Sequence, residues 1–169
     1  MDSSTPAETP VSRDGAIDTI AAQVSAIDEL VGLARTHLQV FDVDLAQGGW
    51  NTAARSEQIA ALLRRQPPVR FDLIVHSTRW LEQSCPRILR LLQLHAHTMT
   101  VLRTGPEARH AMDPLVIADG RHFLHRFHID HPRALLAIEQ PLLTQPLQAR
   151  FEEIWATGEP GLSASVLGL

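Results

Sequence analysis

The sequence predicts an α/β fold in which helices flank a mixed sheet. Helix-like and strand-like segments alternate through the first part of the chain, which is the pattern of parallel strands joined by crossover helices. Further along, Asp119-Gly120 separates two strand-like runs. Asp-Gly favours a tight antiparallel hairpin, because both central residues of that turn need positive φ. The two observations together predict parallel and antiparallel pairs in one sheet.

The first half of the chain supplies the alternating elements. Apolar residues recur at three- and four-residue spacing from about Asp14 to Arg35, which predicts an amphipathic helix. A run of strand formers at 38–45 is broken by two glycines, and a helix then extends to a Pro-Pro pair at 67–68. A second strand is expected at 69–75.

The second half repeats the pattern and then adds the hairpin. A helix is expected at 78–95, with Pro86 at the first turn of its second part. Four further strands are expected, at 99–102, 115–118, 122–127 and 134–138, and a final helix at 141–155 ends before a Gly- and Pro-rich segment. No internal repeat is visible. We therefore expect a mobile tail at 1–14, one domain at 15–158 and a second tail at 159–169.

The composition limits the nucleophiles, the disulfides and the kinds of binding partner that are possible. The 169 residues carry a net charge of −4, which does not favour non-specific binding to nucleic acid or anionic lipid. All fifteen basic residues are arginine and there is no tyrosine, so the only amine nucleophile is the N-terminus. Cys85 is the single cysteine and cannot form an internal disulfide. With no signal-peptide pattern and no long apolar run, we expect a cytoplasmic protein without a cofactor and without a membrane span.

The element order and three short motifs resemble one repeat of the phospholipase D-like superfamily. In that family a strand carries His-x-Lys, four residues and Asp, followed by Gly, and the last helix ends in Phe-x-x-x-Trp. Asp119-Gly120 stands at the Asp and Gly positions, and Phe151-Glu-Glu-Ile-Trp155 matches the helix ending. The segment 134–139 is similar to the strand before that helix. The resemblance covers roughly residues 20–156 and implies an α/β sandwich of the phospholipase D type.

Counting from Asp119 shows which catalytic residues this chain lacks. Pro114 stands where the family has lysine, Met112 where it has histidine, and Arg126-Phe127 where it has Gly-Ser. The resemblance implies that the histidine attacks phosphorus and that lysines hold the phosphoryl oxygens. Methionine does neither, and losing a catalytic nucleophile typically costs on the order of 10⁶ in rate.

We therefore expect a catalytically inactive member that acts as an interaction or regulatory module. Because single-repeat members pair so that two half-sites meet, the resemblance implies a homodimer. A protein partner is a further possibility left open by the sequence.

Two alternatives remain open. Arg121 and Arg126 are candidates to bind a phosphorylated ligand or a nucleic-acid end in the remnant cleft. His110 is a candidate substitute nucleophile, although on a strand it would lie about 6.6 Å from Met112. The histidines between 122 and 131 do not share a face at metal-binding spacing, so no metal is expected.

Overall fold

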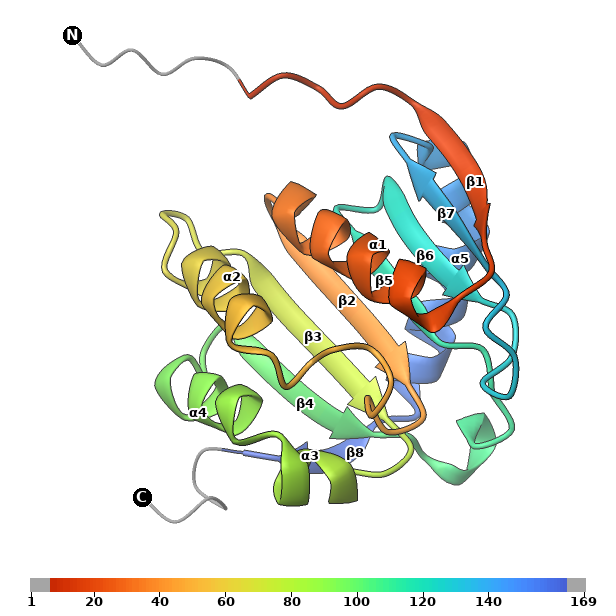
Figure 1. Ribbon diagram of the computed structural model, residues 1–169. Helices are drawn as coiled ribbons and strands as arrows, with labels where there is room; N and C mark the ends of the chain where they lie inside the picture. The colour runs from red at the N-terminus through yellow and green to blue at the C-terminus, as the bar shows by residue number, and fades with distance from the viewer. Residues whose placement is uncertain (1–6, 164–169) are drawn as a thin grey trace, which may run out of the picture.

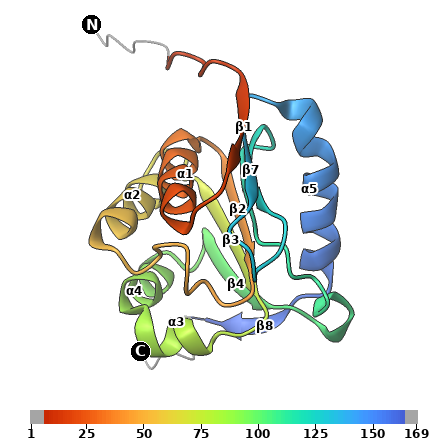
Figure 2. The same ribbon diagram turned by 45° about the vertical axis from the view of Figure 1, so that its right-hand side comes forward.

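In the computed structural model, which describes residues 7–163, one eight-stranded sheet lies between helices on both faces (Figures 1 and 2). The strands are β1 (Arg13–Ile17), β2 (His37–Asp42), β3 (Arg70–Val75), β4 (Met99–Arg103), β5 (Leu115–Ala118), β6 (His122–Arg126), β7 (Ala134–Ile138) and β8 (Glu159–Leu162). The helices are α1 (Ile20–Leu33), α2 (Ala53–Leu63), α3 (Arg79–Ser84), α4 (Pro86–Leu94) and α5 (Pro141–Ala156), with a short 3₁₀ turn, η1, at Pro106–Ala108.

The sheet is mixed, as the sequence predicts. Its strand order is β1-β7-β6-β5-β2-β3-β4-β8, with β2, β3 and β4 parallel and every other neighbouring pair antiparallel. Asp119 and Gly120 have φ values of 57° and 67°, so the predicted hairpin turn between β5 and β6 is confirmed.

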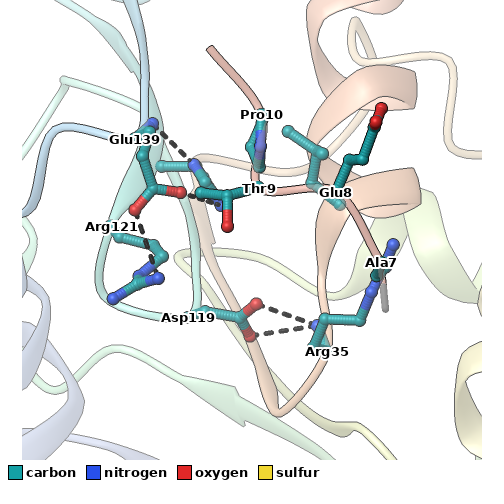
Figure 3. A pocket seen from close by; sticks show the side chains of 10 residues that line it. Ala7, Glu8, Thr9, Pro10, Arg35, Asp119, Arg121 and Glu139 are labelled. Atoms are coloured by element: carbon teal, nitrogen blue, oxygen red, sulfur yellow. Dashed lines mark hydrogen bonds and ion pairs between the residues drawn. The ribbon is translucent and has the colours of Figure 1, made fainter. Parts of the chain in front are cut away.

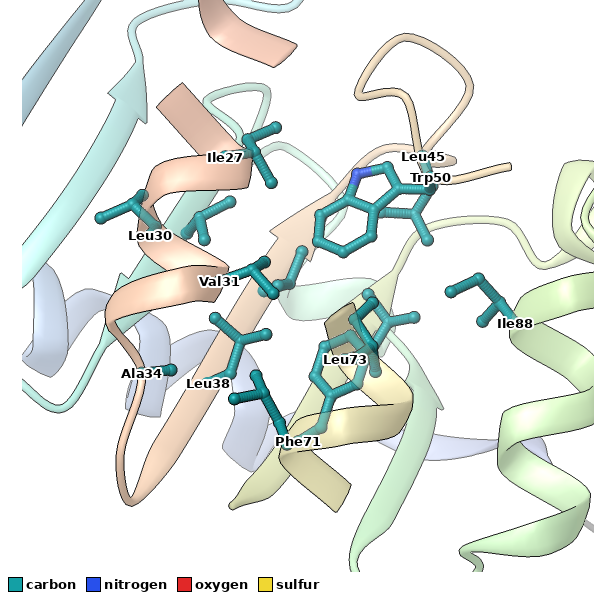
Figure 4. Packing of buried hydrophobic residues seen from close by; sticks show 14 of the residues in the cluster. Ile27, Leu30, Val31, Ala34, Leu38, Leu45, Trp50, Phe71, Leu73 and Ile88 are labelled. Atoms are coloured by element: carbon teal, nitrogen blue, oxygen red, sulfur yellow. The ribbon is translucent and has the colours of Figure 1, made fainter. Parts of the chain in front are cut away.

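Two apolar cores hold the layers together. The larger core lies between the sheet and α1, α2 and α4, where Trp50 stacks on Phe71 with ring centroids 6.2 Å apart (Figure 4). The smaller core lies under α5, which covers the other face of β5 and β6 (Figure 2). Both faces of the central strands are therefore buried, which accounts for their nearly continuous apolar sequences.

The structure differs from the sequence prediction at both ends of the domain. The first helix begins at Ile20 rather than near Asp14, because Thr19 is the N-cap and accepts a hydrogen bond from the amide of Ala22. Residues 13–17 form β1 and pair with β7, whereas Arg13 was expected in the tail and the residues from about Asp14 onward in the helix. Residues 159–162, expected to belong to a tail, form β8 beside β4. Within residues 7–163 no helix is long and apolar enough to cross a membrane.

Candidate functional site

Three of the residues that the sequence singles out, Met112, Pro114 and Arg126, lie at one edge of the sheet. The parallel strands β2, β3 and β4 all end at this edge, and in open α/β sheets ligands bind beyond the carboxyl ends of the strands. Because β5 is antiparallel to β2, it begins here, which places Met112 and Pro114 at the same edge. Arg126, the last residue of β6, lies opposite them, since its amide donates to the carbonyl of Pro114. We call this side of the sheet the carboxyl edge.

Very little space is left at the position of Pro114. Pro114, Asp42 and Arg126 line a small cavity beneath α1, together with Gln47 and Trp50. Its volume is about 20 Å³, which is room for about one water molecule and not for a phosphodiester. Met112 is absent from this lining, and 36% of its surface is exposed.

Arg126 is a buried residue of this cavity. Only 5% of this residue is exposed. Its Nη1 donates to Oε1 of Gln47 at 2.6 Å, its Nε donates to the carbonyl of His131 at 2.7 Å, and its Nη2 donates to the carbonyl of Ile129. The guanidinium thus holds the segment after β6 in place, and each of its three nitrogens already has an acceptor in the chain.

Asp42 is an ionisable group beside this arginine. Burial raises the pKa of Asp42 to about 6, although the amide of Val43 and the charge of Arg126 partly oppose the shift. The carboxylate accepts a hydrogen bond from the Val43 amide at 2.6 Å. Asp42 is therefore the group of this cavity that changes charge closest to neutral pH.

A second polar cluster lies on the α5 face of the carboxyl edge. Asp113 accepts hydrogen bonds from Nε2 of His125 at 2.8 Å and from Nε of Arg150 at 2.7 Å, and Nη2 of Arg150 contacts its other oxygen. Burial raises the pKa of Asp113, but the hydrogen bonds from His125 and Arg150 more than offset it and lower that pKa to about 2. The cluster ties β6 to α5 and to the segment before β5.

His76 and His110 have different surroundings at this edge. His76 bonds through Nδ1 to the hydroxyl of Thr104 and through Nε2 to the carbonyl of Ala111, both at 2.6 Å, and so anchors the segment that leads to Met112. His110 lines a separate cavity of about 210 Å³ on the α5 side, which is also lined by Arg150. His110 therefore does not share the cavity that Pro114 and Arg126 line.

Arg121 lies at the opposite edge of the sheet from Arg126. Arg121 directly precedes β6 and Arg126 is its last residue, so five residue steps separate them by ~16 Å along the strand. Arg121 forms an ion pair with Glu139 at 3.2 Å and lines a cavity of about 150 Å³ with Arg35 and Asp119 (Figure 3). The two arginines that the sequence suggested for one cleft therefore do not form one site.

The Asp119 carboxylate is bound by the backbone of its own chain. Its Oδ1 accepts from the amides of Arg35, Thr36 and His37 and from the Thr36 hydroxyl, at 2.9–3.1 Å. Its Oδ2 accepts from the Arg35 amide at 2.9 Å, and Figure 3 draws the two bonds to Arg35. Burial raises the pKa of Asp119, but these hydrogen bonds outweigh it and lower the pKa below its usual value. Asp119 thus fixes the segment between α1 and β2.

The histidines between 122 and 131 do not gather at one site, although the rings of His128 and His131 lie 6.0 Å apart. Nδ1 of His122 accepts from the amide of Glu139 at 2.8 Å, and burial lowers the pKa of this buried histidine. His125 belongs to the Asp113 cluster, whereas Nδ1 of His128 accepts from the amide of Asp130. Among residues 7–163, no three His, Cys, Asp or Glu side chains come together where they could hold a metal ion.

The sequence did not indicate the Asp113 cluster. Asp113 stands between the two positions that the motif count singles out, but its partner Arg150 is 37 residues away on α5. Motif spacing and periodicity do not predict the contact between Asp113 and Arg150, because this contact depends on where α5 crosses the sheet.

The fold is similar to several solved structures. TrmBL2, an archaeal chromatin protein whose structure shows a novel mode of DNA binding, superposes with a TM-score of 0.67 at 13% identity, over 92% of this chain and 56% of that chain. Nuc of Salmonella typhimurium, a phospholipase D family member, gives a TM-score of 0.59 at 12% identity over 88% and 96% of the two chains. NucT from Helicobacter pylori gives 0.61 at 10% identity over 90% and 100%. At these identities the likeness concerns the fold alone.

A search of curated proteins gave no match. The sequence itself matches a family over residues 19–164, which covers the helices and strands from α1 to β8 and leaves out β1. The chain therefore belongs to the family described as Domain of unknown function (DUF7931), and its fold is that of the phospholipase D-like proteins.

Proposed function

We propose that this protein is a non-catalytic phospholipase D-like domain that acts as an interaction or regulatory module. The observation that carries the proposal is the position of Arg126. Its guanidinium lies in the cavity beside Pro114, in contact with Gln47, and the remaining space is about 20 Å³. A phosphodiester cannot enter this space without displacing an arginine that is bonded to three acceptors of the chain.

The residue types around the cavity support the same proposal. Pro114 has no cation to hold a phosphoryl oxygen, and Met112 has neither a nucleophilic nitrogen nor a titratable proton. Asp42 adds a negative charge in its ionised form, which repels a phosphate. The alternative in which arginines of the cleft bind a phosphorylated ligand is less well supported, because Arg126 is bonded internally and Arg121 lies at the other edge.

We also propose that the protein is a cytoplasmic homodimer. Met112 and Phe127 are two of the exposed large apolar residues, and both lie at the carboxyl edge, Met112 before β5 and Phe127 directly after β6. An exposed apolar pair on a surface otherwise rich in polar groups favours contact with another protein chain. Sedimentation equilibrium is expected to give twice the chain mass of 18.7 kDa.

Hydrolysis assays test the absence of catalysis. We expect no turnover of bis(p-nitrophenyl) phosphate, or of single- or double-stranded DNA, above that of a heat-denatured sample, with or without Mg²⁺ or Mn²⁺. The variant His110→Ala serves as the matched control and is expected to behave identically. Turnover by the wild type that disappears in His110→Ala would contradict the proposal and identify His110 as a catalytic residue.

A further inference from the structure

The side of the sheet opposite the carboxyl edge, which we call the amino edge, carries five exposed arginines. The arrows of β2, β3 and β4 start at this edge in Figure 1, and α1, α2 and α4 each end shortly before one of these strands begins. The turn between β5 and β6 also lies here, because β5 is antiparallel to β2. We call the five arginines the basic belt; they are Arg35, Arg64, Arg65, Arg70 and Arg121.

Contacts with Arg35 and its neighbours in sequence bring the belt together. Arg35 and Arg121 line one open cavity of about 340 Å³. Nη1 of Arg65 donates to the carbonyl of the residue before Arg35 at 3.2 Å. The amide of Arg70 donates to the carbonyl of the residue after Arg35 at 3.0 Å. Four of the five arginines are therefore neighbours on one surface.

The fifth arginine, Arg64, joins the belt to the end of α4. Burial lowers the pKa of His95, and the nearby charges of His97 and Arg64 lower it further. A charge shifts the pKa of a histidine in this way only from a short distance, so Arg64 lies next to these two histidines. The belt therefore extends from the turn between β5 and β6, across the ends of α1 and α2, to the end of α4.

Three carboxylates at this edge are bound within the chain. Asp72 is only 3% exposed and forms an ion pair with Arg70 at 3.0 Å. Asp119 is held by backbone amides and Glu139 by an ion pair, as described above. Glu8, on the segment before β1, is an exposed carboxylate beside the belt. The exposed charges of this surface are therefore mainly positive.

The helix ends account for part of this positive charge. The C-terminal end of a helix carries a partial negative charge, which favours cations beside it. Arg35 and Arg65 fill this role, because both donate to carbonyls at the end of α1. Arg64, Arg70 and Arg121 donate to no helix-end carbonyl within residues 7–163. Helix ends therefore do not explain three of the five arginines.

The belt differs from Arg126 in the donors that it leaves free. All three nitrogens of the Arg126 guanidinium have acceptors in the chain. In each arginine of the belt, at least two of the three guanidinium nitrogens have no acceptor among the described residues. Guanidinium groups bind carboxylates and phosphates through paired N–H donors. The amino edge, and not the cavity at the carboxyl edge, thus has the donors to bind an anionic partner.

We propose that the basic belt binds an acidic segment of a partner protein. This inference rests on the interaction-module role proposed above, and it assigns to that role a surface and the chemistry of the partner. Carboxylates of Asp and Glu side chains complement the free guanidinium donors in charge and in geometry. A short acidic segment can contact the belt alone, without lying over the rest of the molecule.

Two features favour a protein over a nucleic acid at this surface. The chain carries a net charge of −4 although the belt is basic, so the remaining surface is negative and repels a long polyanion. Proteins that bind single strands also stack bases on exposed aromatic side chains. Phe71 and Phe123, which lie close to belt arginines in the sequence, are 1% and 2% exposed and cannot serve in this way.

Two matched charge reversals, measured with one labelled peptide, test the proposal. Arg64 and Arg79 are both exposed, and neither side chain donates a hydrogen bond within residues 7–163. Arg79 begins α3 at the carboxyl edge, far from the belt. Arg64→Glu and Arg79→Glu change the net charge equally, so the variants differ in the place of the change. Fluorescein-labelled decaglutamate is titrated with each protein, and fluorescence anisotropy measures binding.

The wild type is expected to bind decaglutamate with a dissociation constant on the order of 100 µM at about 25 mM NaCl. Because salt screens exposed charges, binding is expected to weaken about fivefold or more at about 250 mM NaCl. Arg64→Glu is expected to weaken binding about fivefold, and Arg79→Glu less than about twofold. A ten-residue oligothymidylate is expected to bind the wild type more weakly than decaglutamate does.

The outcomes separate this inference from the proposal on which it rests. Equal dissociation constants for the two variants, or no binding by the wild type up to about 1 mM, contradict the role of the belt. Either result leaves the absence of catalysis in place, because the hydrolysis assays test that separately. Oligothymidylate that binds more tightly than decaglutamate, and that Arg64→Glu releases, would overturn the acidic protein partner in favour of a nucleic acid. Far-UV circular dichroism is expected to show the same fold in both variants, because both arginines are exposed.

Discussion

The hydrogen bonds of Asp119 account for this residue through its structural role alone. It lies at the turn between β5 and β6, and its carboxylate binds three successive backbone amides. Backbone amides arranged in this way form an anion-binding concavity. Here the bound anion is the carboxylate of Asp119 itself. The aspartate therefore has a structural role that involves no ligand.

Replacing Asp119 by asparagine removes the charge and keeps a side chain that tolerates positive φ. We expect Asp119→Asn to lower the free energy of unfolding by about 1–3 kcal/mol at pH 7. Because the folded-state pKa is lowered, the wild type keeps this advantage above the usual Asp pKa of about 3.9 and loses it as the pH falls through the folded-state value. Urea unfolding between pH 7 and pH 2.5 measures both effects.

Asp130→Asn is the matched control, because the Asp130 side chain is 76% exposed and its contact with His128 spans 3.6 Å. It is expected to change stability by less than about 0.5 kcal/mol. Equal losses in the two variants would show that the amide contacts of Asp119 add nothing to stability.

The sequence predicted individual residues well where the signal is local. The Asp119-Gly120 turn was predicted from two adjacent residues, and its positive φ values confirm it. The predicted strand at 122–127 already implied that Arg121 and Arg126 lie far apart. The hypothesis that both arginines line one cleft did not take this distance into account. The internal hydrogen bonds of Arg126 could not be predicted, because Gln47 is 79 residues away.

At the scale of the elements, one buried arginine joins two helices and a loop. Arg55 of α2 is fully buried. Its Nε donates to Asp28 of α1 at 2.7 Å, and its two terminal nitrogens donate to the carbonyls of Gly48 and Val24. Its guanidinium also lies 4.9 Å from the centre of the Trp50 ring. The connection between β2 and α2 is therefore held by polar contacts inside the larger core.

We expect Arg55→Met to lower the free energy of unfolding by about 3 kcal/mol, because it leaves the buried carbonyl of Gly48 without this donor and removes the charged contact with Asp28. Arg90→Met, on the exposed side of α4, is the control and is expected to cost less than about 0.5 kcal/mol. Thermal and denaturant unfolding of both variants measure the difference. Similar stabilities of the two variants would contradict this role of Arg55.

The elements that the sequence failed to predict are those made by distant partners. Residues 13–17 have no alternating pattern and form a strand because β7, more than a hundred residues away, offers an open edge. Residues 159–162 likewise form β8 beside β4 despite Pro160 and Gly161. The central strands and the main helices were predicted because their own apolar patterns suffice.

At the scale of the whole molecule, the structure has the fold of phospholipase D-like proteins together with a filled cavity at its carboxyl edge. The filled cavity supports the proposal that the outer surfaces of this domain, and not a catalytic cleft, carry its role. Fold similarity alone could not have indicated this, because a fold hosts many functions.

The most direct test of the central claim is the NMR signal of the Arg126 Nε–H, assigned by comparison with Arg126→Gln. The structure predicts a resolved signal near neutral pH that exchanges slowly with water and does not shift when tungstate or dimethyl phosphate is added. We expect slow exchange because the Arg126 Nε–H donates to the His131 carbonyl and only 5% of the residue is exposed. A rapidly exchanging signal that shifts on adding either anion would show that Arg126 is free to bind a phosphate-like ligand, and would contradict the account.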